Sequence, residues 1–487
     1  MKAIIYFFLF PLVILSQSKI NFNDYFTDET MRIDYFHIGS SKSEIFTIDK
    51  IYRYGMWAGS TINLIDELNN GKYYYKIFNV ENGELIYSKG FDTFFQEYAS
   101  TKAGIDGVNK TFHESALIPF PKKKIFFVIA KRNEMNLMDE IFRTEIDPQS
   151  IFIINDKIID NSVEIIKPIK SGHPHKKVDV VVLAEGYTIS EKKKFEDDLR
   201  RFINYFFEQE PYKELKDKFN FYGVFKPSEE SGTDLPGANI FVNTVLNTSF
   251  WTFGSERYLM TEDNKKMRDL AAFVPYDAIY IQVNHPRYGG GGIYNQFCTY
   301  TTDNQFAKYL FIHEFGHSFA GLADEYYTSD VAYTDIHKPT IEPIEPNITA
   351  LLNPDNIKWK SLLSDGIEIP TLWEKEEFDK MSFEWLKERN RLNNYISELK
   401  RNRAPEDQIK AAEDEYAIKD KEQSIKVDNY LRSSKYWNKV GAFEGAGYKP
   451  TGLYRSMLDC IMFSKGDKPF CKVCEEAIKR VIESYTN

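Results

Sequence analysis

Short runs of β-forming residues, separated by turn residues, characterise the chain from Arg32 to about Ile166. Such runs occur at Ile45–Ile48, Tyr73–Phe78 and Lys124–Ile129. The turn residues between them include Gly55, Asn69–Gly71 and Asn82–Gly83. Short strands bounded by such residues are typical of all-β sandwiches. We therefore predict an N-terminal β-sandwich domain over residues 18–168.

The pattern changes after a polar break at Ser171–Lys177. His173 and His175 in this break could bind a metal ion, but a solvated linker is the simpler interpretation. Strand-like runs and a helix-like segment then alternate: strands at Val178–Leu183, Phe219–Phe225 and Tyr276–Val283, and apolar residues at helical spacing over Glu191–Phe207. This alternation predicts an α/β domain over residues 176–487.

One segment of this second domain, about residues 372–436, is rich in Glu, Lys, Arg and Asn and poor in Gly and Pro. That composition predicts charged helices, and the segment is expected to be a surface insertion whose charges face solvent.

The N-terminus has the outline of a secretory signal. Lys2 precedes an apolar run from Ala3 to Leu15, and small polar residues follow. The run is short for a membrane span, and no later apolar run has spanning length, so we expect a cleaved signal peptide at residues 1–17 and no transmembrane segment. The location expected from this is secreted or periplasmic.

Composition narrows the class of function. The 487 residues carry a net charge of −10, which disfavours a nucleic-acid partner because phosphate contacts need a basic surface. Hydrophobic residues make up 43% of the chain, enough for sizeable globular cores. Only 4 cysteines occur, so this is not a disulfide-stapled miniature fold.

The chemistry is concentrated at His313-Glu314-Phe315-Gly316-His317. On a helix, residues four apart share one face, so His313 and His317 can hold one zinc ion, and Glu314 lies where it can act as general base toward a zinc-activated water. Two ordinary histidines on an ordinary helix are the alternative. Gly321, suited to ending the helix, and the carboxylates that follow it favour the zinc interpretation.

The third zinc ligand is expected shortly after Gly321. The long metzincin pattern has glycine three residues, and histidine or aspartate six residues, after the second histidine. Those positions hold Ala320 and Ala323, whereas Gly321 and Asp324 each come one position later. A turn that is one residue longer would bring in Asp324, with Glu325 as the alternative, since a carboxylate oxygen is an acceptable zinc ligand.

The segment His313–Tyr327, HEFGHSFAGLADEYY, resembles the active-site signature of the bacterial IgA-peptidase family of secreted zinc metallopeptidases, which are related to the metzincins. Further segments resemble the same family in the same order: Met31–Tyr35, Trp57–Ser60, Asp179–Thr188, Ser231–Asp234, Phe253–Leu259, Tyr288–Asn295, Glu345–Thr349 and Ile357–Lys360. The resemblance implies a multidomain α+β protein in which an all-β sandwich precedes a zincin-like, metzincin-related α/β catalytic domain. The charged segment at 372–436 has no counterpart in it.

Other residues are expected to support the site. By resemblance, Met462 forms the apolar turn beneath the zinc, with Met457 as the alternative. The glycine run that includes Gly290 and Gly291 would let an extended substrate pair beside the zinc helix, unless it is simply a flexible loop.

Tyr454 and Tyr326 are candidates for binding the oxyanion of the reaction. The cysteines leave several interpretations open. Cys471 and Cys474 form a Cys-x-x-Cys pair that could serve a redox reaction, a disulfide or a metal. Because export favours oxidation, we expect a disulfide between Cys460 and Cys471. A four-cysteine zinc site would need Cys298 as well.

These features together predict a secreted zinc endopeptidase that binds one catalytic Zn²⁺ and acts on protein or peptide substrates, immunoglobulin A or other host proteins among them. A non-catalytic adhesin or glycan-binding protein, with the β-sandwich as its working part, is the alternative outside enzymes. A zinc amidase acting on cell-wall substrates is the alternative within them.

Overall fold

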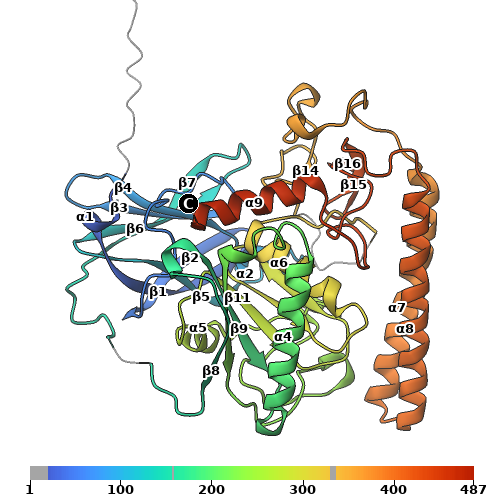
Figure 1. Cartoon of the computed structure of the whole chain (residues 1–487), viewed down its shortest axis with the longest axis horizontal. Helices are drawn as coiled ribbons and strands as arrows, with labels where there is room; N and C mark the ends of the chain where they lie inside the picture. The colour runs from blue at the N-terminus through green and yellow to red at the C-terminus, as the bar shows by residue number, and fades with distance from the viewer. Residues whose placement is uncertain (1–19, 156–157, 329–335, 487) are drawn as a thin grey trace, which may run out of the picture.

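The computed structural model describes residues 20–155, 158–328 and 336–486 (Figure 1). The expected signal peptide at residues 1–17 lies outside these residues. None of the described helices combines the length and the apolar character that crossing a membrane requires.

The N-terminal region contains two antiparallel sheets, with strand orders β2–β1–β5 and β4–β3–β6–β7. Their strands are β1 (Phe26–Ser40), β2 (Ser43–Tyr54), β3 (Tyr73–Asn79), β4 (Leu85–Phe91), β5 (Lys110–Pro121), β6 (Ile125–Arg132) and β7 (Met138–Ile146). Short helices accompany them: α1 (Phe22–Tyr25), α2 (Phe94–Ala99) and α3 (Lys102–Asp106). The expected β-rich N-terminal region is therefore confirmed.

Both sheets bury the same core. Alternate residues of β1, among them Ile33 and Tyr35, meet Tyr75 of β3 and Phe127 of β6 in one buried cluster. Alternation arises because successive side chains of a strand point to opposite faces of its sheet. The rings of Tyr75 and Phe91 stack with centroids 3.9 Å apart. The high aromatic content of this region thus fills the space between the two sheets.

A mixed sheet organises the second region, with the strand order β12–β13–β11–β9–β10–β8. Its strands are β8 (Glu164–Lys170), β9 (Val178–Glu185), β10 (Phe219–Phe225), β11 (Ala278–Val283), β12 (Gly290–Ile293) and β13 (Phe297–Thr301). The four central strands are parallel, and the edge strands β8 and β12 are antiparallel to their neighbours.

The first strand of this sheet crosses the expected domain boundary. β8 pairs with β10, so the limit expected at residue 168 falls inside a strand of the second sheet. The Ser171–Lys177 break, expected to link two domains, instead connects β8 to β9 within one sheet. His175 contacts Asp28 at 2.8 Å rather than joining a metal-binding cluster.

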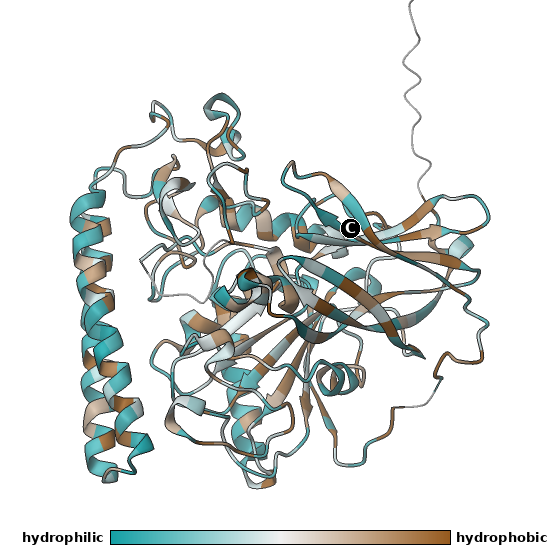
Figure 2. Ribbon diagram, turned by 180° about the vertical axis from the view of Figure 1, so that it is seen from behind, coloured by the Kyte–Doolittle hydropathy of each residue, from teal (hydrophilic) through white to brown (hydrophobic). Residues whose placement is uncertain are grey.

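Apolar side chains bury both faces of this sheet. Val180 and Val182 of β9 face one core together with helices α4, α6 and α9. Val181 and Leu183 face the other core, which includes α5 and the aromatic side chains of α2 from the N-terminal region. A strand covered on both sides needs apolar side chains on both faces, which explains the run from Val180 to Ala184 in β9. Figure 2 shows the sheet strands as predominantly hydrophobic ribbons.

The helices and remaining strands of the second region are α4 (Lys192–Glu208), α5 (Asn264–Ala271), α6 (Ala307–Ala320), α7 (Lys375–Arg401), α8 (Glu406–Arg432), α9 (Lys472–Thr486), β14 (Ile348–Thr349), β15 (Phe443–Ala446) and β16 (Lys449–Arg455). Short 3-10 helices lie at Pro174–Lys176, Ile189–Glu191, Lys216–Lys218, Pro236–Ala238, Thr252–Gly254, Pro354–Asn356 and Lys360–Leu362. The strands β14, β16 and β15 form a small antiparallel sheet in that order.

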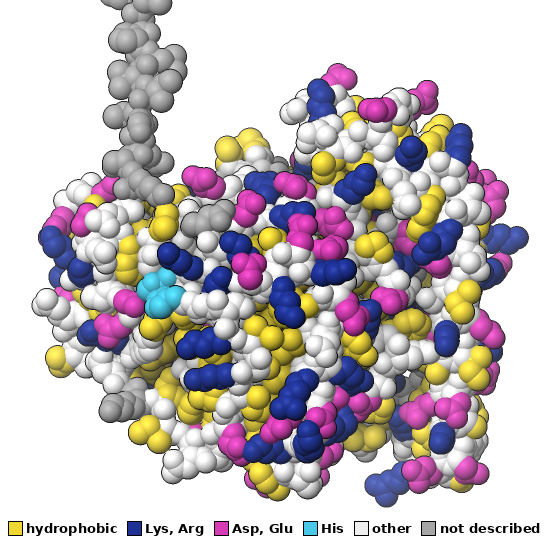
Figure 3. Space-filling view, in the orientation of Figure 1, with side chains coloured by type: hydrophobic (Ala, Val, Ile, Leu, Met, Phe, Trp, Pro, Cys, Tyr) yellow, Lys and Arg dark blue, Asp and Glu magenta, His cyan; other side chains and the backbone are white. Residues whose placement is uncertain are grey.

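The expected charged helices are observed as α7 and α8, which lie side by side as a pair at one side of the molecule (Figure 1). A small apolar cluster of Ile396, Leu399 and Ala412 joins their ends. Acidic and basic side chains are interspersed along the pair (Figure 3), as in the ion pair of Lys400 with Glu413 at 2.6 Å. These charges form a solvated surface, as the sequence indicates.

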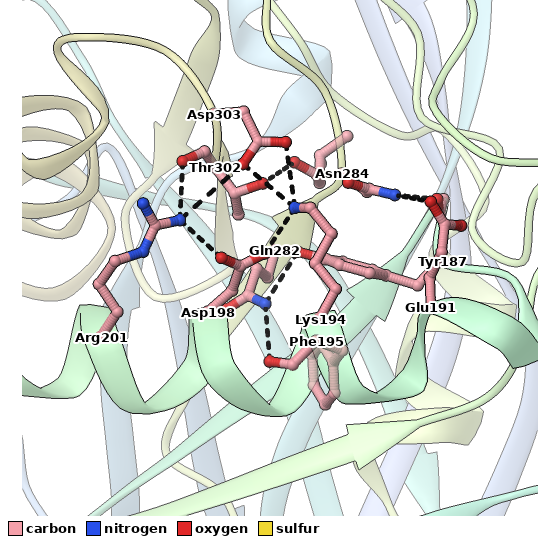
Figure 4. A network of polar contacts seen from close by, with 12 residues as sticks. Tyr187, Glu191, Lys194, Phe195, Asp198, Arg201, Gln282, Asn284, Thr302 and Asp303 are labelled. Carbon is pink, nitrogen blue, oxygen red and sulfur yellow. Dashed lines mark hydrogen bonds and ion pairs between the residues drawn. The ribbon is translucent and has the colours of Figure 1, made fainter.

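A polar network anchors α4 to the loops at the carboxyl ends of the central strands (Figure 4). The Asp198 carboxylate, 6% exposed, accepts hydrogen bonds from the Tyr187 hydroxyl at 2.9 Å, from Lys194 at 2.8 Å and from Arg201 at 2.6 Å. Arg201 also donates to the carbonyl oxygen of Thr302 at 3.0 Å. Asp198 and Arg201 together therefore join the helix to two loops of the sheet.

We expect Asp198→Ala to lower the free energy of unfolding by about 2 kcal/mol, because a buried, charge-assisted hydrogen-bond acceptor is lost. Asp197→Ala on the same helix removes only the exposed Lys193–Asp197 pair and should leave stability unchanged. Chemical denaturation followed by circular dichroism measures both. Equal stability of the two variants would show that the network does not stabilise the fold.

Candidate metal centre

Helix α6 carries both histidines of the motif on one face. The helix is apolar almost all round and nearly all of its residues are buried, as expected for a helix packed between the sheet and α9. The Nε2 atoms of His313 and His317 lie 3.2 Å apart. The spacing of four residues thus produces the convergence that the sequence predicts.

The chain reverses at Gly321, which follows α6 with a φ of 62°. Its amide donates to the carbonyl oxygen of His317 at 3.0 Å, and the amide of Leu322 donates to that of Gly316 at 3.2 Å. Glycine adopts this left-handed conformation without strain. The reversal brings Asp324 Oδ1 to 3.1 Å from His313 Nε2 and 3.2 Å from His317 Nε2.

Two carbonyl oxygens orient the histidine rings. His313 Nδ1 donates to the carbonyl oxygen of Ile461 at 3.0 Å, and His317 Nδ1 donates to that of Leu322 at 2.6 Å. With the Nδ1 protons held there, each neutral ring directs the lone pair of Nε2 toward Asp324.

Asp324 Oδ1 has no hydrogen-bond partner among the described residues, although the residue is only 6% exposed. Three buried lone pairs that face one another need a cation or a proton between them. Ligands about 2.1 Å from a tetrahedral centre lie about 3.4 Å from each other, close to the separations here. His313, His317 and Asp324 therefore have the donor atoms and the separations that would hold a divalent metal ion.

Electrostatics favour a charged centre. Burial by itself would lower the pKa of His317, but the Asp324 carboxylate outweighs it and raises that pKa to about 9. Burial would likewise raise the pKa of Asp324, but the two histidines hold it well below its usual value. A metal ion would take the place of the proton that His317 otherwise holds.

Glu325, the alternative third ligand, faces the other way. It is fully buried, accepts a hydrogen bond from Asn347 Nδ2 at 3.0 Å and lies 3.4 Å from the sulfur of Cys474. Of the two neighbouring carboxylates, only Asp324 meets the histidines.

The prediction of a disulfide between Cys460 and Cys471 is wrong. All four cysteines are free and buried in the structure. Cys460, Cys471 and Cys474 gather with Glu325, whereas Cys298 lies on β13 and contacts the carbonyl oxygen of Ile279. The four-cysteine arrangement is therefore not formed either.

The segment around Met462 packs against α6. Met462 is fully buried, and a Cβ atom on Gly316 of α6 would lie 3.0 Å from its sulfur. Its carbonyl oxygen accepts from the amide of Glu325 at 2.8 Å, and the preceding Ile461 holds His313. Met462 thus packs directly against α6, while Met457 is buried elsewhere in the same core.

Glu314 lines a cleft beside the three converging side chains. Burial raises its pKa above the usual value, and the neighbouring His313 and His317 offset part of this effect. Other lining residues come from β12, the loops before α5 and before β12, the segment after α6, the turn between β15 and β16, and α2 with the loop before it. They include Asp92, Thr93, Gln96, Glu97, Arg257, Tyr258, Tyr288, Gly290, Gly291, Gly292, Tyr326 and Tyr448. The N-terminal region therefore forms part of the cleft wall.

Glycines let β12 lie directly against α6. A Cβ atom on Gly292 would come within 2.5 Å of the carbonyl oxygen of Glu314, and one on Gly290 within 3.1 Å of Glu314 Cγ. The main chain of Gly290 is already occupied, because it donates to Arg257 and accepts from Leu259, each at 3.3 Å. An extended substrate could therefore pair with Gly290 only by displacing the Arg257–Leu259 segment, which differs from the expected direct pairing of substrate with the glycine run.

Of the two tyrosines singled out from the sequence, only Tyr326 lines the cleft. Its ring lies parallel to that of His313 with centroids 6.4 Å apart, and its hydroxyl accepts from Arg257 Nη2 at 2.9 Å. Tyr454 pairs with Thr349 in the small sheet and is not among the residues that line the cleft.

Sequence reasoning missed Tyr448, whose hydroxyl donates to Asp324 Oδ2. Gly447 and Tyr448 form the two-residue turn between β15 and β16, with φ values of 55° and 64°. Positive φ at both positions defines a type I′ turn, and it is uncommon for tyrosine. Turn residues between two short strands are the signal that could have identified the hairpin, but nothing local indicates its partner Asp324.

Two family models match the chain. One, described as IgA Peptidase M64, matches residues 166–482, and the other, described as Peptidase M64 N-terminus, matches residues 21–143. Comparison with curated proteins finds no match.

We expect Tyr448→Phe to weaken the binding of a divalent metal ion at this centre at least about 10-fold, since the hydroxyl that orients Asp324 is removed while the ring is kept. Tyr454→Phe, on the adjoining strand but away from the cleft, should bind the metal ion as the unaltered chain does. Competition with a chromophoric chelator measures both affinities. Equal affinity of the two variants would show that the Tyr448 hydroxyl does not position the ligand.

Proposed function

The chain belongs to the IgA peptidase M64 family and is a metallopeptidase, and we propose that it is a secreted zinc endopeptidase that hydrolyses peptide bonds within proteins. The observation that carries this proposal is the buried convergence of His313 Nε2, His317 Nε2 and the otherwise unpartnered Asp324 Oδ1 beside Glu314 in an open cleft. Two nitrogens and one oxygen suit zinc, and an open position is what a catalytic site needs.

A zinc ion bound there would supply Lewis-acid chemistry, polarising the scissile carbonyl group and lowering the pKa of water. The chain's own residues would handle the protons. We assign to Glu314 the role of general base, with its carboxylate taking a proton from the attacking water and then giving it to the leaving amine nitrogen. Its raised pKa suits a group that must first accept and then release a proton.

Tyr326 is the residue that we assign to the developing oxyanion. Its hydroxyl accepts a hydrogen bond from Arg257, which leaves its own proton free to be donated. A donor that is polarised by a guanidinium and fixed before the reaction lowers the barrier without reorganising. Arg257 thus contributes positive charge to the cleft wall through Tyr326.

We further propose that the second region has a zincin-like, metzincin-related fold. An antiparallel edge strand, β12, beside the histidine-bearing helix, a glycine reversal after that helix and a methionine beneath it support this assignment. The two N-terminal sheets around one core support a β-sandwich.

Export, to the exterior or the periplasm, also remains our proposal and rests on the sequence of residues 1–17. The substrate class is protein, because the family is one of peptidases, and immunoglobulin A is the first candidate because the family description names it.

The test is cleavage of a panel of purified proteins, immunoglobulin A included, by the chain without residues 1–17. Glu314→Gln should lower kcat/KM about 10³-fold, because the general base is lost, while metal content stays unchanged since Glu314 is not a ligand. Glu208→Gln, a change at an exposed ion pair on α4, is the matched control and should cleave normally.

Mass spectrometry of the products and metal analysis of each variant give the two readings. Undiminished cleavage by Glu314→Gln would contradict the assigned base. Chelator-resistant cleavage would contradict the metal mechanism altogether.

A further inference from the structure

A second group of metal-ligating side chains lies on the other side of the Asp324–Glu325 segment. It consists of Glu325, Cys460, Cys471 and Cys474, all buried, whose ligand atoms all lie within 4.8 Å of one another. They come from the turn after α6, the loop after β16 and the start of α9. Residues far apart in the sequence thus converge at one point that the proposed catalytic chemistry does not use.

The separations match a tetrahedral site. The sulfurs of Cys460 and Cys474 are 3.8 Å apart, and Glu325 Oε1 lies 3.4 Å from the Cys474 sulfur and 3.9 Å from that of Cys471. Sulfurs about 2.3 Å from a common zinc ion lie about 3.8 Å from each other, and a sulfur and an oxygen ligand about 3.6 Å. A disulfide would instead require sulfurs about 2.05 Å apart.

Main-chain amides donate hydrogen bonds to two of these sulfurs. The amide of Cys471 donates to the Cys460 sulfur at 3.1 Å, and the amide of Cys474 donates to the Cys471 sulfur at 3.4 Å. Hydrogen bonds from amides favour the thiolate over the thiol. The Cys-x-x-Cys segment therefore presents amides that would stabilise thiolate ligands of a metal ion.

Glu325 supplies an independent indication of a cation. It is fully buried, and its Oε2 atom has no hydrogen-bond partner among the described residues. The buried Arg455 does not fill this role, because its guanidinium donates to the carbonyl oxygens of Gly445 and Leu458. No ion pair between Arg455 and Glu325 occurs in the described part of the chain. A buried carboxylate beside three thiol groups is costly without a compensating charge.

We propose that Glu325, Cys460, Cys471 and Cys474 bind a structural zinc ion, distinct from the catalytic one. Three sulfurs and one oxygen form a closed tetrahedral donor set, with no position left for substrate. On binding, each thiol releases its proton to solvent and its sulfur bonds to the metal. A disulfide between any two of the cysteines would leave the third thiol and the carboxylate buried together without compensation.

The position of this site links it to the proposed catalytic site. Glu325 and Asp324 are neighbours in the chain, and the amide of Glu325 is held by Met462. A metal ion on Glu325 would fix the segment that presents Asp324 to the histidines, and it would attach that segment to α9 through Cys474.

The first experiment measures zinc per chain. The unaltered chain should hold two equivalents. The His313→Ala/His317→Ala double variant should hold one, and so should the Cys471→Ser/Cys474→Ser double variant. Cys298→Ser, which changes a buried cysteine outside the cluster, is the matched control and should keep two.

The second experiment replaces zinc with cobalt, because thiolate ligands give an intense charge-transfer absorption that histidine and carboxylate ligands lack. The band should persist in the histidine double variant and vanish in the cysteine double variant. Its presence in the histidine variant would uphold this site even if the proposed peptidase activity failed, so the two proposals are tested separately.

Since cysteine variants can fail to fold, a third measurement uses only the unaltered chain. Alkylation after denaturation in chelator, without reductant, should modify four thiols. The native zinc-loaded chain should resist alkylation of the three cluster cysteines until a chelator is added. Modification of only two thiols would reveal a disulfide and overturn the proposal. The absence of a thiolate-to-cobalt absorption band in the unaltered chain would also overturn it.

Discussion

The reversal of the chain after α6 is the constraint on which the rest of this structure depends. It places two consecutive carboxylates, Asp324 and Glu325, in two different buried polar clusters. Neither carboxylate could be buried alone, because desolvating a charge without a partner costs several kcal/mol. The surrounding elements supply those partners, and this requirement explains why distant parts of the chain meet here.

Each of these elements contributes through its main chain as well as its side chains. The loop at Ile461 and Met462 holds one histidine and the amide of Glu325 through carbonyl oxygens. The Gly447–Tyr448 turn binds Asp324 through the Gly447 amide at 3.0 Å and through the tyrosine hydroxyl. A tyrosine with positive φ is strained, and such strain is kept where surrounding contacts determine the conformation. The orientation of Asp324 is therefore set by long-range contacts rather than by its own turn.

The N-terminal region contributes to both the core of the second sheet and the cleft. Its α2 aromatic residues Phe94 and Phe95 join the core on one face of the second sheet, and Thr93 and Glu97 line the cleft. The proposed accessory domain thus completes the sheet's burial and one wall of the site. A substrate entering the cleft would meet both regions, which suits a large substrate better than a small one.

The sequence by itself determined whatever depends on local periodicity. The spacing of His313 and His317 defines one face of any helix, the apolar run at Val180–Ala184 favours a strand buried on both faces, and the composition of α7 and α8 favours solvated helices. Even the end of α6 follows from Gly321, because few other residues adopt its conformation.

Only the tertiary structure decided what depends on contacts between distant segments. It placed Asp324 rather than Glu325 beside the histidines, brought Tyr448 rather than Tyr454 to the cleft, joined β8 to the second sheet and gathered three cysteines where the sequence suggested a disulfide. In each case the local sequence does not distinguish the alternatives. The outcome depends on contacts between distant segments, because a charged or polar side chain is buried only where the fold supplies a partner for it.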